Sequence, residues 1–299
     1  MTSYTAIASN TQKTSLFMAG FVVFLVFFMY VVGELSGYGS SFVWIGVLLS
    51  LASCFGSYYF GDQIVIAMSG ARKADRKKEF DFFTVSENIA IAAGIPKPAL
   101  YVIDDTAMNA FATGRDPEHA VICATSGILE RLSRRELEAV IAHEISHIKY
   151  YDIRLMVVVA VLAGTIAFVS DMFMRSLWFG GNRRNRDRDD NGGVFIIIGI
   201  VLMIASPFIA TIIQLAISRN REFLADAGSA ELTRNPDALV RALQKISKDT
   251  EVLEAATNAT AHLFISNPFK GKSSHAWFAS FFDTHPAIDA RIAALKAMK

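Results

Sequence analysis

His143-Glu144-Ile145-Ser146-His147 lies inside an apolar segment that has the periodicity of a helix. Two histidines four positions apart face the same side of an α-helix, so both imidazoles can reach one metal ion. The glutamate between them is then turned towards the water molecule that is to be activated. This pattern predicts a zinc hydrolase that cleaves peptide bonds. The alternative is a surface helix with two solvated histidines, because a pattern this short also arises by chance.

The residues around this stretch predict where the helix begins and which face it buries. Ser133 and Glu136 have the spacing of a capping box, in which each side chain accepts a hydrogen bond from a backbone N–H at the helix start. Apolar residues then follow at helical spacing: Leu137, Val140, Ile141, Ile145 and Ile148. We therefore expect the metal-binding residues on a regular helix with one apolar face.

The composition places part of the chain in a membrane. Of its 299 residues, 53% are hydrophobic and only 19% are charged, and the mean hydropathy of +0.36 is too high for an ordinary soluble enzyme. The formal net charge of +1 leaves no general basic surface for nucleic acid. Cys54 and Cys123 lie far apart in apolar segments, so neither a disulfide framework nor a cysteine zinc site is predicted.

Residues 15–33 and 42–60 are predicted to be transmembrane helices. Each segment has 19 residues, which as a helix cross about 30 Å of hydrocarbon. Residues 34–41 between them contain no lysine or arginine, whereas basic residues gather after the second segment: Arg72, Lys73, Arg76, Lys77 and Lys78. By the positive-inside rule, the hairpin starts and ends in the cytoplasm.

Two further apolar segments, 155–174 and 194–218, interrupt the polar part of the chain. If both cross the membrane, the loop between them carries five arginines outward, against the positive-inside rule. A hairpin that enters the membrane without crossing it removes this conflict, and the sequence leaves both possibilities open. In either case, the chain before residue 155 and the chain after residue 218 share one compartment.

The sequence therefore predicts a mostly helical α+β membrane protein in four parts. We expect an N-terminal transmembrane hairpin (1–70), the first half of a peptidase domain (71–154), an apolar helical hairpin (155–218) and the second half of the domain (219–299). The predicted elements are a helix over 80–93, short strands over 99–103 and 120–124, and helices opened by Asn235-Pro236 and by Pro286-Ala287. A small sheet thus precedes the metal helix.

A zinc ion needs at least one protein ligand beyond the two histidines, and Glu222 is the best candidate. It begins the polar chain directly after the apolar segment 194–218, and Asp226 follows it at a spacing of four. On a helix, this pair lets the glutamate bind the metal while the aspartate accepts a hydrogen bond from a ligand histidine. The alternative is a solvated acidic face balanced by Arg219 and Arg221.

Three stretches together make the sequence resemble the HtpX-type membrane zinc metallopeptidases, which are related to the prenyl-protein (CaaX) endopeptidases. They are His143 to His147, the run Arg-Glu-Phe-Leu-Ala-Asp at 221–226, and Asn-Ala-Phe-Ala-Thr-Gly at 109–114. The resemblance extends to Thr284-His285-Pro286 and covers nearly the whole chain. It implies a gluzincin-like site in which His143, His147 and Glu222 bind one Zn²⁺, Glu144 is the catalytic base and Asp226 orients a ligand histidine.

The same resemblance implies how substrates are bound. Segment 109–114 would border the substrate cleft, with Asn109 a substrate-binding residue and an exposed strand edge that pairs with an extended peptide. The alternative is a turn whose Asn and Gly serve backbone geometry only. His285 would donate to the developing oxyanion or cap the final helix, and Ala287 departs from the proline that relatives often repeat.

The resemblance also implies a role: the cleavage of misfolded or damaged membrane proteins at the cytoplasmic face of a bacterial inner membrane, with other quality-control proteases as partners. Two alternatives from other classes stay open at this stage. The first is a membrane scaffold that binds zinc without turnover, which a closed fourth ligand would favour. The second is a small transporter, since polar residues lie near or within the apolar segments: Asp62, Asp171 and Gln214.

Overall fold

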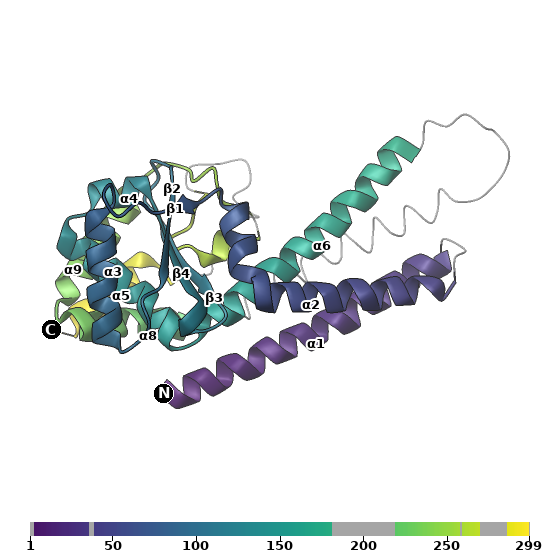
Figure 1. Ribbon diagram of the computed structural model, residues 1–299, viewed down its shortest axis with the longest axis horizontal. Coiled ribbons are helices and arrows are strands. Elements are labelled where there is room, and N and C mark those ends of the chain that lie inside the picture. Colours follow the sequence, from purple (N-terminus) through teal and green to yellow (C-terminus); the bar gives the residue numbers. More distant parts are fainter. Residues whose placement is uncertain (1–2, 36–38, 181–218, 258, 270–285, 299) are drawn as a thin grey trace.

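A computed structural model describes residues 3–35, 39–180, 219–257, 259–269 and 286–298. Figure 1 shows two parts: a small sheet surrounded by helices, and three long helices that extend from it to one side. The long helices are α1 (Ser3–Leu35), α2 (Ser41–Met68) and α6 (Asp152–Gly180). The predicted apolar segment 194–218 lies outside the described residues.

All three long helices contain a stretch that is long and apolar enough to cross a membrane: Ile7–Glu34, Ser41–Met68 and Asp152–Val169. The two predicted N-terminal segments are therefore helical, and each helix is longer than its predicted core. The third stretch differs from the first two because 67% of it is buried within the protein. The first part of α6 thus packs mainly against protein.

Small residues on α2 allow these helices to approach closely. Its buried face is formed by Gly46, Ser50, Cys54, Ser57, Gly61 and Val65. A methyl group at Gly46 would crowd Met29 of α1, and one at Gly61 would overlap Val157 of α6. Small side chains at such crossings let apolar helices make close van der Waals contact.

The sheet has four strands in the order β1-β2-β4-β3. They are β1 (Arg72–Lys73), β2 (Ala99–Ile103), β3 (Ala110–Gly114) and β4 (Ala120–Thr125). Strands β2 and β4 were predicted, and they pair in parallel, whereas β1 and β3 pair antiparallel with their neighbours. The segment containing Asn109 therefore leads into an edge strand and does not form a turn.

The sheet separates two hydrophobic cores. Because side chains alternate along a strand, Ile122 and Ala112 point to one face while Cys123 and Phe111 point to the other. The first face packs with α3 (Phe80–Ala93), α5 (Arg134–Lys149), α9 (Pro236–Lys248) and α11 (Ile288–Lys296). The second face packs with α1, α2 and α6, so the apolar residues of the long helices and of the sheet form one continuous cluster.

The remaining described elements are α4 (Ser126–Arg131), α8 (Arg219–Thr233) and two short 3₁₀ helices, η1 (Pro117–His119) and η2 (Ala261–Leu263). Several predicted boundaries are confirmed. Helix α3 spans 80–93 and ends at Gly94, whose positive φ of 70° allows the left-handed cap. Asn235 caps α9 through its side chain. Helix α11 begins at Ile288, two positions after the predicted Pro286.

Helix α5 lies at the centre of the first core and begins with the predicted capping box. The carboxylate of Glu136 accepts a hydrogen bond from the backbone N–H of Ser133 (2.8 Å) and from Lys245 of α9 (2.7 Å). Although burial opposes ionisation, these hydrogen bonds lower the pKa of Glu136 below its usual value. One side chain therefore both starts the metal helix and joins it to α9.

We predict that Glu136→Ala lowers the free energy of unfolding by about 1–2 kcal/mol, because the cap and the contact with Lys245 are lost together. A lowered folded-state pKa stabilises the fold above the unfolded-state pKa, and that contribution disappears as the pH falls through the folded-state pKa. The difference between variant and wild type should therefore shrink in acid. Thermal unfolding in detergent at pH 7 and pH 4 measures both, with the more exposed Glu138→Ala on the same helix as control.

Candidate metal centre

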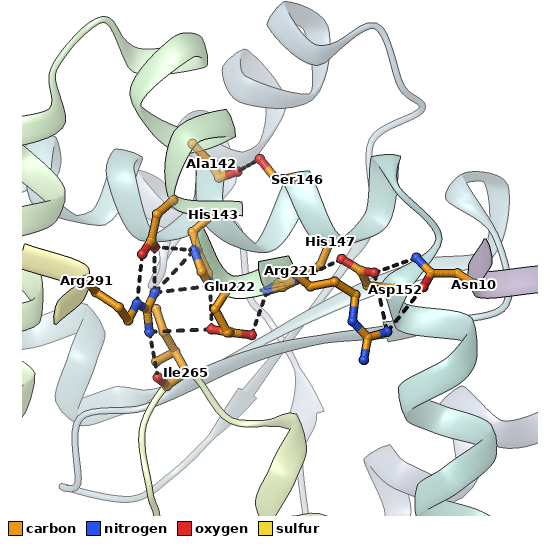
Figure 2. A network of polar contacts seen from close by, with 11 residues as sticks. Asn10, Ala142, His143, Ser146, His147, Asp152, Arg221, Glu222, Ile265 and Arg291 are labelled. Atoms are coloured by element: carbon orange, nitrogen blue, oxygen red, sulfur yellow. Dashed lines mark hydrogen bonds and ion pairs between the residues drawn. The ribbon is translucent and has the colours of Figure 1, made fainter. Parts of the chain in front are cut away.

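Helix α5 presents His143 and His147 one turn apart on a buried face. Their side chains are 1% and 6% exposed, and their Nε2 atoms lie 3.2 Å from each other. Both Nε2 atoms therefore point to a common position (Figure 2). The interpretation of these residues as solvated surface histidines is wrong.

Helix α8 brings the carboxylate of Glu222 to the same position. One carboxylate oxygen lies 3.7 Å from Nε2 of His143, and the other lies 3.6 Å from Nε2 of His147. The three ligand atoms lie within 4.8 Å of one another. Two atoms bound to one tetrahedral ion at about 2.1 Å are separated by about 3.4 Å, so the observed spacings fit a shared metal ion.

The Nδ1 atom of each histidine contacts a different aspartate. His143 Nδ1 lies 3.0 Å from Asp226 of α8, as the sequence predicted. His147 Nδ1 lies 2.9 Å from Asp152, the first residue of α6. A histidine that donates from Nδ1 keeps the lone pair of Nε2 for a metal, so the two aspartates fix the tautomer and the ring orientation.

Arg291 of α11 is the largest addition that the structure makes to the predicted site. It is fully buried and contacts Asp226 through Nε (2.9 Å) and Nη2 (2.7 Å). Its Nη1 lies 3.5 Å from the carboxylate of Glu222. This arginine therefore holds the carboxylates of Glu222 and Asp226 together, and Figure 2 shows Arg291 beside Glu222.

Sequence reasoning missed Arg291 and Asp152, although each carried a signal. Arg291 lies on the helical face that also carries Ile288, Ile292 and Leu295, where a charged residue has to find a buried partner. Asp152 stands at the start of a long apolar segment, five residues after His147. Neither signal names the partner, because that partner lies on another element.

The formal charges around the site also fit a divalent cation. Four carboxylates are buried there, each at most 3% exposed: Glu144, Asp152, Glu222 and Asp226. Arg221 contacts Asp152, and Arg291 contacts Glu222 and Asp226. Buried charge of one sign is costly, so a site rich in carboxylates favours positive charge beside it. A divalent ion bound by His143, His147 and Glu222 would add such charge.

The same charges separate the pKa values of the two histidines. Burial lowers the pKa of His143 to about 4, with the positive charge of Arg291 acting in the same direction. Burial also opposes protonation of His147, but the hydrogen bond with Asp152 and the charges of Glu222, Asp152 and Glu144 raise its pKa to about 9. A metal ion at this site would therefore replace a proton on His147.

Of the other predicted residues, Glu144 lies in the site, Asn109 immediately precedes strand β3, and His285 falls outside the described residues. The buried carboxylate of Glu144 raises the pKa of both His147 and Arg291. Asn109 is buried and donates from its side chain to the carbonyl of Ser266 (3.0 Å). In addition, the Ile265 N–H donates to the carbonyl of Ala110 (2.9 Å), so part of the edge of β3 is paired with this segment.

Comparison of the sequence with known protein families identifies the family of this chain. The model of peptidase family M48 matches residues 76–299, which include His143, His147 and Glu222. The chain belongs to peptidase family M48. Together with its membrane helices, this membership makes the protein a membrane-bound metallopeptidase, so the scaffold and transporter interpretations are not supported.

Several curated M48 relatives match along their whole length. A protein named "Protease HtpX homolog" from Caldanaerobacter subterraneus subsp. tengcongensis is 43% identical over 99% of this chain and 98% of its own. Proteins of the same name from Thermoanaerobacter pseudethanolicus and Ligilactobacillus salivarius are 43% and 41% identical, each over 99% of this chain and 98% and 99% of their own. The resemblance noted from the sequence motifs is confirmed.

A solved structure shares the fold. The crystal structure of S. mikatae Ste24p superposes with a TM-score of 0.50 at 20% sequence identity. The match covers 97% of this chain and 66% of that chain. The fold is therefore shared with a longer chain, of which this chain covers about two thirds.

Gly228 determines how closely α8 approaches α5 in this M48 domain. A methyl group at this position would overlap the side chain of Ser146, which lies between the two histidines. One residue further along, the hydroxyl of Ser229 donates to the carbonyl of Ala139 (2.6 Å). Glu222 can reach the histidines because the two helices touch here.

We predict that Gly228→Ala lowers the free energy of unfolding by about 1–3 kcal/mol and weakens metal binding, since overpacking pushes α8 away from α5. Adding Ser146→Gly removes the obstructing atoms and should restore metal content. The measurement is bound metal per protein together with thermal unfolding. Gly56→Ala serves as control, because nothing lies within 4 Å of the added methyl group. Normal metal content in the single variant would contradict the prediction.

Proposed function

We propose that this protein is a zinc-dependent endopeptidase that cleaves misfolded or damaged membrane proteins. The observation that carries the proposal is the convergence of His143, His147 and Glu222 on one buried position with Glu144 beside it. Nitrogen and carboxylate ligands in this number are typical of catalytic zinc, which keeps its fourth position open. Membership of a metallopeptidase family supports the same conclusion.

When bound, zinc supplies Lewis-acid polarisation of the scissile carbonyl and lowers the pKa of a water molecule. In our proposal, Glu144 takes the proton from the attacking water and delivers it to the leaving amine. Asp226 and Asp152 keep the two imidazoles in the orientation that points Nε2 to the metal. Arg291 holds Glu222 and Asp226 in place, and no covalent intermediate with the protein is needed.

Substrate contacts are also part of the proposal. We assign Asn109 and the strand β3 that follows it to substrate binding by backbone pairing. The side chain of Asn109 itself donates a hydrogen bond to the carbonyl of Ser266. Its role would then be to hold residues 264–266 beside β3, where they shape the cleft. His285 is proposed as a donor to the developing oxyanion.

We propose that the peptidase part faces the cytoplasm from a bacterial inner membrane. Basic residues follow α2, whereas the turn between α1 and α2 contains none. The names of the full-length relatives, protease HtpX homologs, support a protease in a membrane setting. A site attached directly to membrane helices would meet polypeptides that emerge from the bilayer, with other quality-control proteases as partners.

We predict that Glu144→Gln reduces the rate of cleavage of an unfolded protein by about 10²–10⁴-fold while zinc is retained, because the base is lost and the ligands are not. The measurement is proteolysis by detergent-purified protein together with zinc content. Glu138→Gln makes the same change at a less buried position of the same helix and should leave the rate unchanged. Undiminished cleavage by Glu144→Gln, or a wild type without zinc, would overturn the proposed mechanism.

The proposed orientation predicts opposite labelling of two introduced cysteines. Ser40→Cys lies in the exposed turn before α2, and Lys77→Cys lies in the exposed stretch after it. In intact spheroplasts, a membrane-impermeant maleimide should label Cys at position 40 only, and position 77 should react after permeabilisation. The native Cys54 and Cys123 are buried and give little background. The reverse labelling pattern would show that the peptidase part faces outward.

A further inference from the structure

We propose that Asn10 of the first membrane helix is a positioning residue for the metal ligand His147 and acts through Asp152. The N-terminal helix would then be part of the metal centre in addition to anchoring the protein. This inference rests on the proposed function, in which His147 binds zinc. It assigns a role to a residue near the start of the chain, far in sequence from the histidine motif.

A continuous chain of hydrogen bonds connects the helix with the site (Figure 2). The side-chain amide of Asn10 donates to Oδ1 of Asp152 (2.6 Å), and the other oxygen of Asp152 lies 2.9 Å from Nδ1 of His147. Asn10 and Asp152 are 3% and 1% exposed. Water therefore has little access to replace the contact if Asn10 is removed.

Further contacts determine which way the amide of Asn10 points. The Oδ1 atom of Asn10 accepts a hydrogen bond from Arg221 of α8 (3.3 Å), and Arg221 also lies 3.6 Å from Asp152. The amide nitrogen also donates to the carbonyl of Tyr150 (3.0 Å). A cation on one side and acceptors on the other allow a single orientation of the amide. Asn10 thus joins α1, α8 and the α5–α6 corner at one point.

This corner needs external support. Helix α5 ends at Lys149 and α6 begins at Asp152. Between them, Tyr151 has a φ of 60°, which residues other than glycine rarely adopt. The two bonds from Asn10 reach the residues on either side of Tyr151. They fix the direction in which the carboxylate of Asp152 points, and the carboxylate in turn fixes the ring of His147. Outer contacts of this kind change metal affinity by about 10–100-fold.

The first test compares Asn10→Ala with wild type in the full-length, detergent-purified protein. We expect zinc to transfer to a chromophoric chelator about tenfold faster, and kcat to fall while KM changes less than about twofold. Thr14→Ala is the matched control, since Thr14 is buried one turn further along α1 and its hydroxyl contacts only the backbone of Asn10. Asn10→Ala that releases zinc at the wild-type rate would overturn the inference while leaving the proposed function intact.

The second test exchanges the two side chains and does not depend on how well Asn10→Ala folds. In Asn10→Asp, two carboxylates face each other. In Asp152→Asn, if the new amide oxygen accepts a hydrogen bond from His147, the new NH₂ group faces the NH₂ group of Asn10. The double variant Asn10→Asp/Asp152→Asn restores a donor opposite an acceptor and keeps an acceptor for His147. We expect each single variant to lose zinc at least about tenfold faster than wild type. The double variant should recover part of the difference, because the carbonyl of Tyr150 still lacks its donor from position 10.

The outcomes separate the two proposals. Recovery in the exchange variant supports a direct link from α1 to the metal centre. If the effect of the double variant on zinc release equals the sum of the effects of the two single variants, Asn10 and Asp152 act independently and the inference is overturned. A wild type that binds no zinc overturns the inference together with the proposed function, whereas zinc-loaded wild type with normal zinc release in both single variants overturns the inference alone.

Discussion

Compensation of buried negative charge is the constraint on which the rest of this structure depends. Glu144, Asp152, Glu222 and Asp226 lie within one small volume that excludes water. Carboxylates in such an environment are stable only with positive charge and hydrogen-bond donors next to them. Arg291 supplies such charge from α11 and Arg221 supplies it from α8, and a divalent ion would add more. The chain must therefore bring four distant elements to one place before the site can exist.

The packing of the helices follows from this requirement. Helix α5 is buried on nearly all sides, so its neighbours can approach to within the reach of short side chains. Gly228 allows α8 to touch it beside Ser146, and α11 packs against α9 and α8, from where Arg291 reaches Asp226. Close packing of this kind transmits small displacements, because the interior has few voids in which to absorb them. The positions of the proposed metal ligands therefore depend on how closely these helices pack.

The membrane helices are integrated into the same construction. One face of the sheet contributes Phe111 and Cys123 to an apolar cluster with Leu25 of α1 and Val157 of α6. The sheet is therefore buried on both faces, which explains why β3 and β4 are apolar at nearly every position. A peptidase part cut away from α1 and α2 would expose this face to water. The four-part division predicted from the sequence remains a prediction, and the shared core argues against treating the first part as a separable anchor.

The sequence by itself determined the features that depend on neighbours within a few residues. Helix periodicity, the capping box at Ser133, the glycine cap at Gly94 and the length of the apolar segments are all local. The bounds of α3 and the start of α5 could therefore be predicted, and the N-terminal hairpin could be predicted as two helices, although α1 and α2 are longer than their predicted apolar cores. Segment 109–114 was the exception, because pairing with β4, the next strand along the chain, makes residues 110–114 a strand.

Only the tertiary structure decided which distant side chains meet. Asn10 and Arg221 are 211 positions apart, and Arg291 and His143 are 148 apart. Sequence spacing carries no information about such contacts, because they depend on the packing of helices whose order in the chain does not fix their arrangement in space. The motif predicted which histidines would bind a metal, and the fold placed the aspartates, arginines and asparagine around them.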